Sequence, residues 1–205
     1  KGSASFMKNI LIIGGMGAGK SSATRALASQ GLPVIDLDQL GHVVLNWDFV
    51  RKELRDAYSA GVFTAEGDVD RAALAAAAFA TKEGTETLNR ITQPRIDQAL
   101  HDELERFAAE GHAAAVIESS SFTGQAPLVA LADYIVVVTA PEELRVARAV
   151  AAGWREADVR ARMARQLTDG ERLRYATVAF VNDGTPEQLY DQVVSWWSAE
   201  KERLS

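Results

Sequence analysis

Short apolar segments alternate with longer segments of helical periodicity along this chain. The apolar segments are bounded by glycine, acidic or turn residues and predict five buried strands: Lys8–Ile13, Leu32–Asp36, Ala113–Glu118, Tyr134–Thr139 and Val178–Val181. The run Val136–Val138 is wholly β-branched, which is typical of a strand that is covered on both faces. Strands that alternate with helices predict an α/β fold, in which a parallel five-stranded sheet carries helices on both faces.

The intervals between the strands show the apolar spacing of helices. The predicted helices are Ser21–Gln30, Phe49–Tyr58, Arg71–Ala80, Thr85–Thr92, Arg95–Ala109, Glu142–Ala151, Glu156–Leu167 and a last helix that starts at Pro186. Thr185 is the expected N-cap of this last helix, because Pro186 takes the first helical position and Gln188 completes a capping box. The helical region 39–111 separates the second strand from the third, and it predicts an inserted, cap-like part of a single domain.

Composition narrows the class of protein. The chain has 205 residues, 47% hydrophobic and 24% charged, which is an ordinary globular composition. No apolar run reaches the roughly 18 residues that a membrane-spanning helix needs, and the net charge of -6 argues against a general nucleic-acid binder. The lack of cysteine excludes disulfides and cysteine-based zinc sites, and the histidines show no spacing that indicates a metal site. We expect a cytoplasmic protein without an obligate protein partner, whose natural chain starts at Met7 after a short remnant, Lys1–Phe6.

The segment Gly14–Ser21 reads GGMGAGKS and matches the pattern G-x-x-x-x-G-K-[ST] of a phosphate-binding loop, or P-loop. Glycines let successive N–H groups turn inward around phosphate oxygens, and the helix that follows adds its positive N-terminal end. Lys20 is expected to reach the β and γ phosphates, and the Ser21 hydroxyl to ligate Mg²⁺. The predicted binding site for ATP and Mg²⁺ takes its nucleotide contacts from Gly15, Met16, Gly17, Ala18, Gly19, Lys20, Ser21 and Ser22.

Acidic residues end two of the predicted strands. Asp36 and Asp38 lie at the C-terminal edge of the second strand, where open parallel sheets bind ligands, and alternation puts both on the same side if the strand persists. One is a candidate for orienting Mg²⁺-bound water and the other for accepting the proton of an attacking hydroxyl. The alternative is that one of them caps the helix that starts near Gln39. Glu118 ends the third strand and is a candidate for binding Mg²⁺ through water, or it belongs with Ser119–Ser121 to a polar turn.

Eight arginines but only four acidic residues lie between positions 145 and 174. The arginines are Arg145, Arg148, Arg155, Arg160, Arg162, Arg165, Arg172 and Arg174. A net positive segment in a net acidic chain predicts a lid over the ATP phosphates, because arginine forms forked hydrogen bonds to a transferring phosphoryl group and neutralises its charge. The alternative is a solvated amphipathic helix, which we expect to explain most of these residues and to leave two or three with a function.

Seven stretches, spread over nearly the whole chain, together resemble the dephospho-coenzyme A kinase family. They are GGMGAGKSS (14–22), GLPVIDLD (31–38), GDVDRAALAAAAF (67–79), LNRITQPRI (88–96), DYIVVVTAPEELRVAR (133–148), EADVRARMARQ (156–166) and VNDGTPEQL (181–189). The resemblance implies a P-loop kinase that transfers the γ-phosphate of ATP to the ribose 3′-hydroxyl of dephospho-CoA, the last step of coenzyme A synthesis. It also implies a core of residues 7–38, 112–152 and 171–205, a helical substrate-binding region at 39–111 and a lid at 153–170.

The resemblance assigns roles to single residues. Asp38, the second acid of the pair, becomes the general base, and Asp36 supports it or the metal. The remaining assignments are metal binding by Ser21 and Glu118, a nucleotide contact at Asn182, and substrate contacts at Asp36, Arg71 and Gln93.

Three departures from the family pattern lie on the substrate or lid side. The pair Gln93–Pro94 stands where the family has His-Pro, residues 118–122 read ESSSF in place of Pro-Leu-Leu-x-Glu, and Ala152 replaces an arginine before Gly153. They leave two alternatives open: a related P-loop kinase that acts on another small acceptor, and a nucleotide-binding relative that has lost catalysis.

The missing arginine at Ala152 has candidate replacements nearby. Arg148 lies four residues earlier, hence on the same helix face, and Arg155 lies three residues later. We expect Arg148, together with Arg155 or Arg162, to supply the cation that phosphoryl transfer needs and so to act catalytically.

Overall fold

The computed structural model describes residues 7–204, so the expected remnant before Met7 lies outside the described residues. The chain forms two compact units. The first contains the chain up to Asp36 and from Glu105 onward, and the second is Leu37–Leu104. Within residues 7–204, no helix is both long and apolar enough to cross a lipid bilayer.

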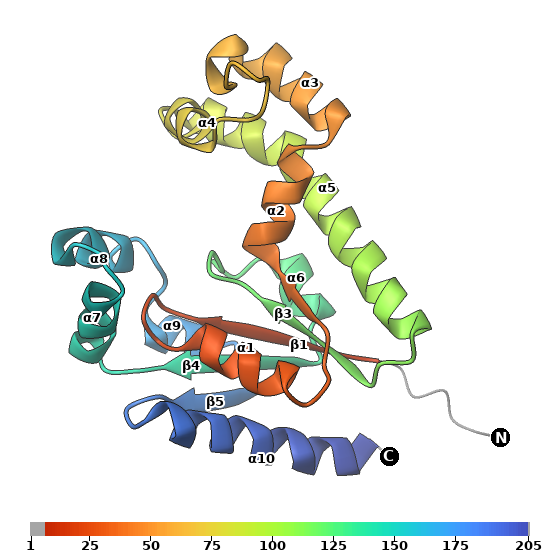
Figure 1. Cartoon of the computed structure of the whole chain (residues 1–205), viewed down its shortest axis with the longest axis vertical. Helices are drawn as coiled ribbons and strands as arrows, with labels where there is room; N and C mark the ends of the chain where they lie inside the picture. The colour runs from red at the N-terminus through yellow and green to blue at the C-terminus, as the bar shows by residue number, and fades with distance from the viewer. Residues whose placement is uncertain (1–6, 205) are drawn as a thin grey trace. The chain divides into compact units, whose positions relative to one another are not determined.

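The first unit is built on a five-stranded sheet with the order β2-β3-β1-β4-β5, in which all neighbouring strands are parallel (Figure 1). The strands are β1 (Lys8–Gly14), β2 (Val34–Asp36), β3 (Ala114–Glu118), β4 (Tyr134–Thr139) and β5 (Val178–Val181). The central strand β1 is fully buried from Ile10 to Ile13, as its continuous apolar run predicts. The predicted α/β fold and its five strands are confirmed.

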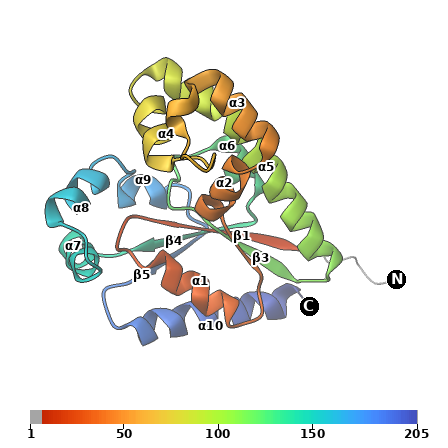
Figure 2. The same cartoon turned by 45° about the horizontal axis from the view of Figure 1, so that its top comes forward.

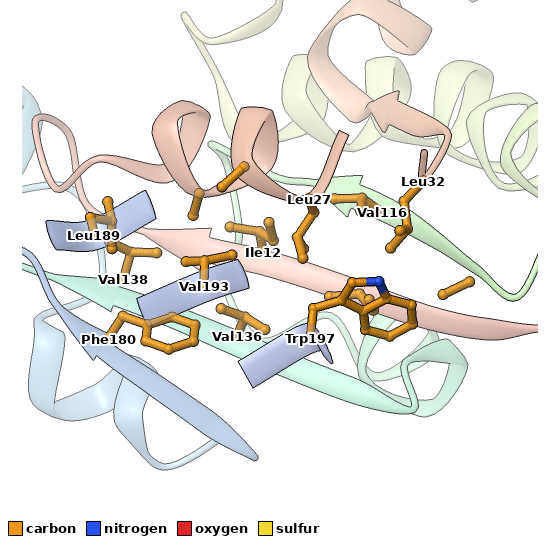
Figure 3. Packing of buried hydrophobic residues seen from close by; sticks show 14 residues of the cluster. Ile12, Leu27, Leu32, Val116, Val136, Val138, Phe180, Leu189, Val193 and Trp197 are labelled. Atoms are coloured by element: carbon orange, nitrogen blue, oxygen red, sulfur yellow. The ribbon is translucent and has the colours of Figure 1, made fainter. Parts of the chain in front are cut away.

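Helices cover both faces of this sheet. The helices of the first unit are α1 (Lys20–Ala28), α6 (Ala126–Leu131), α7 (Glu142–Ala151), α8 (Glu156–Met163), α9 (Asp169–Leu173) and α10 (Pro186–Leu204). The helices α1 and α10 pack together on one face, and α9 contacts β1 and β4 on the other (Figure 2). Leu189, Val193 and Trp197 of α10 point into a core formed with α1, β1 and β4 (Figure 3).

The start of α10 follows the predicted capping box. The Thr185 N–H donates to Gln188 Oε1 over 2.8 Å, and the Gln188 N–H donates to Thr185 Oγ1 over 3.3 Å. Two of the N–H groups that a helix start leaves without a partner in the helix are thereby satisfied.

The second unit is helical. Its elements are α2 (Leu37–Leu45), α3 (Asp48–Tyr58), the short 3₁₀ helix η1 (Ala60–Val62), α4 (Arg71–Ala78) and α5 (Lys82–Ala109), whose last residues belong to the first unit. A small core of its own holds it together, with Val44, Val50 and Leu54 completely buried. The division lies close to the predicted helical region 39–111, and acceptor binding by this region stays a prediction.

One helix corrects the sequence analysis. Two helices were expected, Thr85–Thr92 and Arg95–Ala109, because proline disfavours a helical interior. The structure has one helix of 28 residues, α5, with Pro94 inside it. The lack of one N–H donor at Pro94 leaves the other hydrogen bonds of the helix available, and the Thr92 hydroxyl donates to the Leu88 carbonyl over 2.9 Å in the turn before the proline.

Candidate active site

The P-loop connects the central strand to the first helix. The strand β1 ends at Gly14 and α1 begins at Lys20, so the predicted strand–loop–helix context is confirmed. Gly17 and Gly19 have φ angles of 73° and 106°, a conformation that disfavours residues with a side chain. A Cβ atom at Gly17 would meet the carbonyl oxygen of Arg145, and one at Gly19 would meet the amide of Asn182. The glycines therefore satisfy both the backbone conformation and the close packing of the loop.

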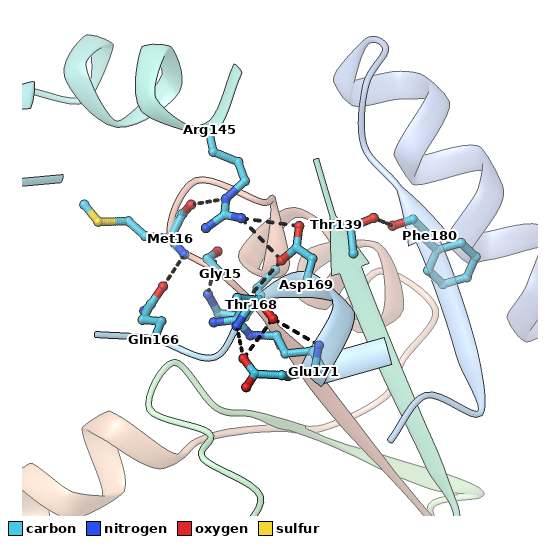
Figure 4. Close-up of polar contacts among 11 residues, drawn as sticks. Gly15, Met16, Thr139, Arg145, Gln166, Thr168, Asp169, Glu171 and Phe180 are labelled. Atoms are coloured by element: carbon cyan, nitrogen blue, oxygen red, sulfur yellow. Dashed lines mark hydrogen bonds and ion pairs between the residues drawn. The ribbon is translucent and has the colours of Figure 1, made fainter. Parts of the chain in front are cut away.

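Three side chains from distant segments hold the loop. Arg145 Nε, on α7, donates to the Met16 carbonyl over 2.9 Å, and the Met16 N–H donates to Gln166 Oε1 over 3.0 Å (Figure 4). Asn182, which directly follows β5, donates from Nδ2 to the Ala18 carbonyl over 2.8 Å. The loop is thus fixed by side-chain contacts as well as by its own backbone.

Arg145, the arginine that contacts the loop, is itself fixed by an ion pair. Arg145 Nη1 lies 3.3 Å from both carboxylate oxygens of Asp169 (Figure 4). Arg172 Nη1 lies 3.1 Å from Asp169 Oδ1. Arg145 is 8% exposed and Arg172 only 2%. Burial lowers the pKa of Arg172 from its ordinary value, and the Asp169 carboxylate opposes this effect. Two buried cations share one carboxylate, so the contact keeps a net positive charge beside the loop.

Asp169 is held in place by the start of its own helix. Thr168 and Glu171 form a complete capping box at the N-terminus of α9. Hydrogen bonds from the Thr168 N–H and hydroxyl lower the pKa of the Glu171 carboxyl. The box fixes the first turn of α9, in which Asp169 is the first residue.

An oxygen-rich corner lies where the loop meets β3. Ser21 Oγ donates to Glu118 Oε1 over 2.8 Å, and Glu118 is 8% exposed. Asp36 is the register partner of Glu118 across the β2–β3 pair, so the two carboxylates extend from the same face of the sheet at its C-terminal edge. The two residues assigned to the metal from the sequence are thus in contact, and metal binding by them stays a prediction.

The donor set in this corner fits Mg²⁺, which prefers oxygen ligands and usually keeps water and phosphate oxygens in its shell. Within residues 7–204, no group of three or more His, Cys, Asp or Glu side chains could hold a metal ion. A hydroxyl and a buried carboxylate are nevertheless sufficient on the protein side when substrate phosphates supply the remaining ligands. Ser21 and Glu118 are therefore the residues that fit this role.

Lys20 is the first residue of α1 and is 9% exposed. Its Nζ lies 3.5 Å from the Gly15 carbonyl, at the outer limit of a hydrogen bond. The ammonium group thus extends back along its own loop. A phosphate bound by that loop would therefore lie near this cation.

The candidate catalytic arginine, Arg148, contacts the same asparagine that holds the loop. Its Nη1 donates to the Asn182 carbonyl over 3.0 Å, and its Nη2 lies 3.4 Å from Asn182 Oδ1. Of the two suggested helpers, Arg155 pairs with Asp158 at the surface and Arg162 lies over the Trp154 ring, 4.4 Å from its centroid.

The condition for placing Asp36 and Asp38 on the same side, a strand that persists to Asp38, is not met. Alternation required the strand to continue beyond Asp36, but β2 ends there and α2 begins at Leu37. Asp38 therefore lies in the first turn of a helix, in the second unit, where the positive end of the helix favours a carboxylate.

The other predicted acceptor residues lie at the surface of the second unit. Arg71 Nη1 lies 2.8–2.9 Å from the ring nitrogens of His42, and both residues line a cavity of about 350 Å³ together with Asp68 and Asn46. Gln93 donates to Asp97, one turn later on α5, over 2.8 Å. The cavity combines an arginine and a histidine with polar groups.

Sequence reasoning missed the contacts of Gln166 and Asp169 and did not single out Arg145. Gln166 lies 150 positions from its partner Met16, and Arg145 lies 129 positions from the same residue. Asp169 lies 24 positions from its partner Arg145. Each looks like an ordinary polar residue of a surface helix, and one sequence offers no local signal for such contacts. The arginine-rich composition of residues 145–174 pointed to the segment but not to its two buried members.

Comparison with known proteins gives a consistent result. The family model for dephospho-CoA kinase matches residues 9–188. A dephospho-CoA kinase from Corynebacterium jeikeium is 37% identical over 193 residues, which cover 93% of this chain and 98% of the relative. The dephospho-CoA kinase of Deinococcus radiodurans is 38% identical over 183 residues, or 89% of this chain and 87% of the relative.

A solved structure also resembles the whole fold. TT1252 from Thermus thermophilus superposes with a TM-score of 0.83 at 28% identity, over 95% of this chain and 98% of its own. Both compact units therefore lie within the matched length.

Proposed function

The chain belongs to the dephospho-CoA kinase family, and from this premise we propose how its residues perform ATP-dependent phosphorylation of dephospho-CoA. In this reaction the ribose 3′-hydroxyl of dephospho-CoA attacks the γ-phosphorus of ATP. A new P–O bond forms, the bond between the γ-phosphorus and the β,γ-bridging oxygen breaks, and the proton of the hydroxyl passes to a base. The products are CoA and ADP. The main support for this proposal is the Ser21–Glu118 contact next to an intact P-loop, because P-loop enzymes bind Mg²⁺ with the loop hydroxyl and a nearby strand-end carboxylate.

The loop binds and orients the nucleotide. Residues 15–22 form the proposed phosphate site, in which backbone N–H groups of the loop point at the phosphates and the N-terminus of α1 adds a positive partial charge. Lys20 extends along the loop and donates to the β and γ phosphates. Ser21 and Glu118 would hold Mg²⁺, which would neutralise part of the phosphate charge.

Asp38 is the proposed general base. Its carboxylate can accept the proton that the 3′-hydroxyl loses. It lies in the first turn of α2, at the positive end of that helix. Asp36, two residues earlier at the end of β2, supports the metal side, since it is the register partner of Glu118.

Arg148 is the proposed cation for the charge that develops on the transferring phosphoryl group. Its guanidinium has five N–H donors, and its contacts with Asn182 engage Nη1 and Nη2. In this proposal it exchanges one of these contacts for a γ-phosphoryl oxygen, since Ala152 provides no cation. Residues 153–170 form the proposed lid, and Gln166 joins it to the P-loop through Met16.

The second unit is the proposed acceptor-binding region. Arg71 and the cavity beside it offer cationic and polar groups to the phosphates of dephospho-CoA, and Gln93 offers an amide. We place the reaction in the cytoplasm, where coenzyme A synthesis uses ATP.

The proposal is tested by measuring ADP release from Mg·ATP with dephospho-CoA and with a panel of nucleosides, sugars and nucleotides. The account expects turnover with dephospho-CoA to exceed that with every other acceptor. Faster turnover of another acceptor would support a related kinase. Nucleotide binding without turnover of any acceptor would support a relative that has lost catalysis.

A further inference from the structure

The carbonyl groups of the P-loop are held from outside at alternate positions. The Met16 carbonyl accepts from Arg145 Nε over 2.9 Å, and the Ala18 carbonyl accepts from Asn182 Nδ2 over 2.8 Å. Every described peptide bond is trans. In a planar trans peptide the C=O of one residue and the N–H of the next point in opposite directions. A side chain that holds the Met16 or the Ala18 carbonyl therefore also sets the direction of the following N–H.

Those following N–H groups belong to Gly17 and Gly19. In the part of the chain that the structure describes, neither N–H donates to another protein atom. Their neighbours differ: the Met16 N–H donates to Gln166, and the Ala18 N–H donates to the Gly15 carbonyl over 3.1 Å. Protein acceptors thus take alternate N–H groups along the loop, and the two glycine N–H groups between them are left for a ligand.

We propose that Arg145 and Asn182 are positioning residues, each of which aims one glycine N–H at the nucleotide phosphates. Arg145 acts through the Met16 carbonyl on the Gly17 N–H, and Asn182 acts through the Ala18 carbonyl on the Gly19 N–H. The inference deepens the proposed function, since it rests on the P-loop as the phosphate site. Successive N–H groups that converge on an anion are effective only when their directions are fixed in advance.

Each positioning residue is fixed by a second contact. Asp169 bonds to Arg145 Nη1, which leaves Nε directed at the loop. Arg148 Nη2 contacts Asn182 Oδ1, so the amide oxygen faces the arginine and its NH₂ group faces Ala18. The two arms share no side chain: Arg145 and Asp169 form one, and Asn182 and Arg148 form the other, although both arginines belong to α7.

The separate arms make a selective experiment possible. The protein is labelled with ¹⁵N-glycine, and the amide signals of Gly17 and Gly19 are followed by NMR as Mg·ADP is added. ADP permits no phosphoryl transfer, so the readout does not depend on the acceptor. In the parent protein both signals are expected to move downfield when their N–H groups bond to phosphate oxygens. Arg145→Gln should remove most of the shift of Gly17 and leave that of Gly19. Asn182→Ala should do the reverse.

Two matched variants control for general damage. Arg203→Gln removes an arginine that pairs with Glu200 at the surface of α10. Asn9→Ala removes an asparagine amide that donates to a distant backbone carbonyl, at Leu131, as the amide of Asn182 does at Ala18. Both controls should keep the parent response of Gly17 and Gly19. Equal losses at both glycines in each test variant, or responses like the parent's, would overturn the inference.

A third variant keeps the test decisive if Arg145→Gln does not fold. Asp169→Asn leaves Arg145 in place and weakens the contact that directs it, so the Gly17 response should fall selectively but less. Arg145→Lys, which keeps the charge and one donor group, should lie between the parent and Arg145→Gln. An Asp169→Asn protein with the full Gly17 response would contradict the proposal.

Turnover separates this inference from the proposed function. With dephospho-CoA as acceptor, Arg145→Gln should lower kcat by about 10²-fold, the usual cost of one misplaced donor, with an unchanged KM for the acceptor. If the parent makes no CoA, but Arg145→Gln and Asn182→Ala each lose the shift of their own glycine selectively, the proposed function is refuted and the positioning inference stands. If the parent makes CoA, but the two variants show no selective loss, the positioning inference is refuted and the proposed function stands.

Discussion

The P-loop region and the helical second unit are built in different ways. Around the loop, Lys20, Glu118 and Asn182 are each less than 10% exposed, and contacts from distant segments fix the loop. In the second unit the candidate acceptor residues Arg71 and Gln93 are exposed and bond to neighbours on the same small unit. The proposed nucleotide side is therefore preorganised, whereas the proposed acceptor side depends on a few surface groups. Two of the three departures from the family pattern, at residues 93 and 152, also lie at exposed positions.

The largest expected effect comes from the P-loop lysine. Lys20→Ala should lower kcat by at least about 10³-fold, because it removes the cation proposed to contact the transferring phosphate. ATP affinity should fall as well, whereas the circular dichroism spectrum and the melting temperature should stay close to the parent's. Lys201→Ala, on the exposed face of α10, is the matched control. Unchanged turnover of Lys20→Ala would remove the P-loop from the mechanism.

The carboxylate of Asp38 tests whether the second unit contributes a catalytic residue. Asp38→Asn keeps the size of the side chain and removes the base, so kcat should fall by about 10²–10⁴-fold with ATP affinity nearly kept. Asp48 lies in the first turn of α3, as Asp38 does in α2, so Asp48→Asn loses the same favourable interaction with a helix N-terminus. If both variants lose only stability and keep kcat, Asp38 is a helix-capping residue and not the base.

The arginine proposed for the transferring phosphoryl group gives an intermediate effect. Arg148→Ala should lower kcat by about 10²-fold or more and lower ATP affinity far less, since the contact is made mainly in the transition state. Ala152→Arg in that background should restore part of the rate. Parent-like kinetics for both variants would show that this segment does not reach the phosphates.

The smallest expected effect concerns the metal. Glu118→Gln should raise the Mg²⁺ concentration needed for half-maximal rate by about 10–100-fold, because a buried carboxylate next to the Ser21 hydroxyl is lost. The KM for dephospho-CoA should not change, which would sharpen the division between nucleotide side and acceptor side. Glu200 accepts a hydrogen bond from the Tyr134 hydroxyl over 2.8 Å, so Glu200→Gln removes a similar contact elsewhere. The same Mg²⁺ dependence in both variants would argue against a metal role for Glu118.

The sequence was most informative where structure depends on local pattern. The strands Tyr134–Thr139 and Val178–Val181 and the helix Glu142–Ala151 have the predicted bounds, since their apolar spacing is clear. The helix α9 was not predicted, because its five residues are too few to show helical periodicity. It is held by its capping box and by the ion pairs of Asp169, two kinds of contact that hydrophobic pattern does not reveal.

In the candidate site, too, the sequence predicted the residues set by local pattern but not the contacts between distant segments. The glycine motif predicted the loop, Lys20 and Ser21, because backbone geometry and phosphate chemistry dictate those residue types in that order. The hydrogen bonds that Met16 of the loop forms with Gln166 and Arg145 join residues more than 100 positions apart, and they depend on how the helices pack. The condition for the strand-end geometry at Asp38 is not met for a related reason: the turn from β2 directly into α2 is set by tertiary packing rather than by alternation.

The central claim is the identity of the reaction, and the product tests it most directly. The parent protein is incubated with Mg·ATP and dephospho-CoA, and the product is analysed by mass spectrometry and phosphorus NMR. The account predicts CoA, with one new phosphate monoester at the ribose 3′ position and one ADP formed for each CoA. A phosphate at any other position, or unchanged dephospho-CoA beside efficient phosphorylation of a different acceptor, would contradict it.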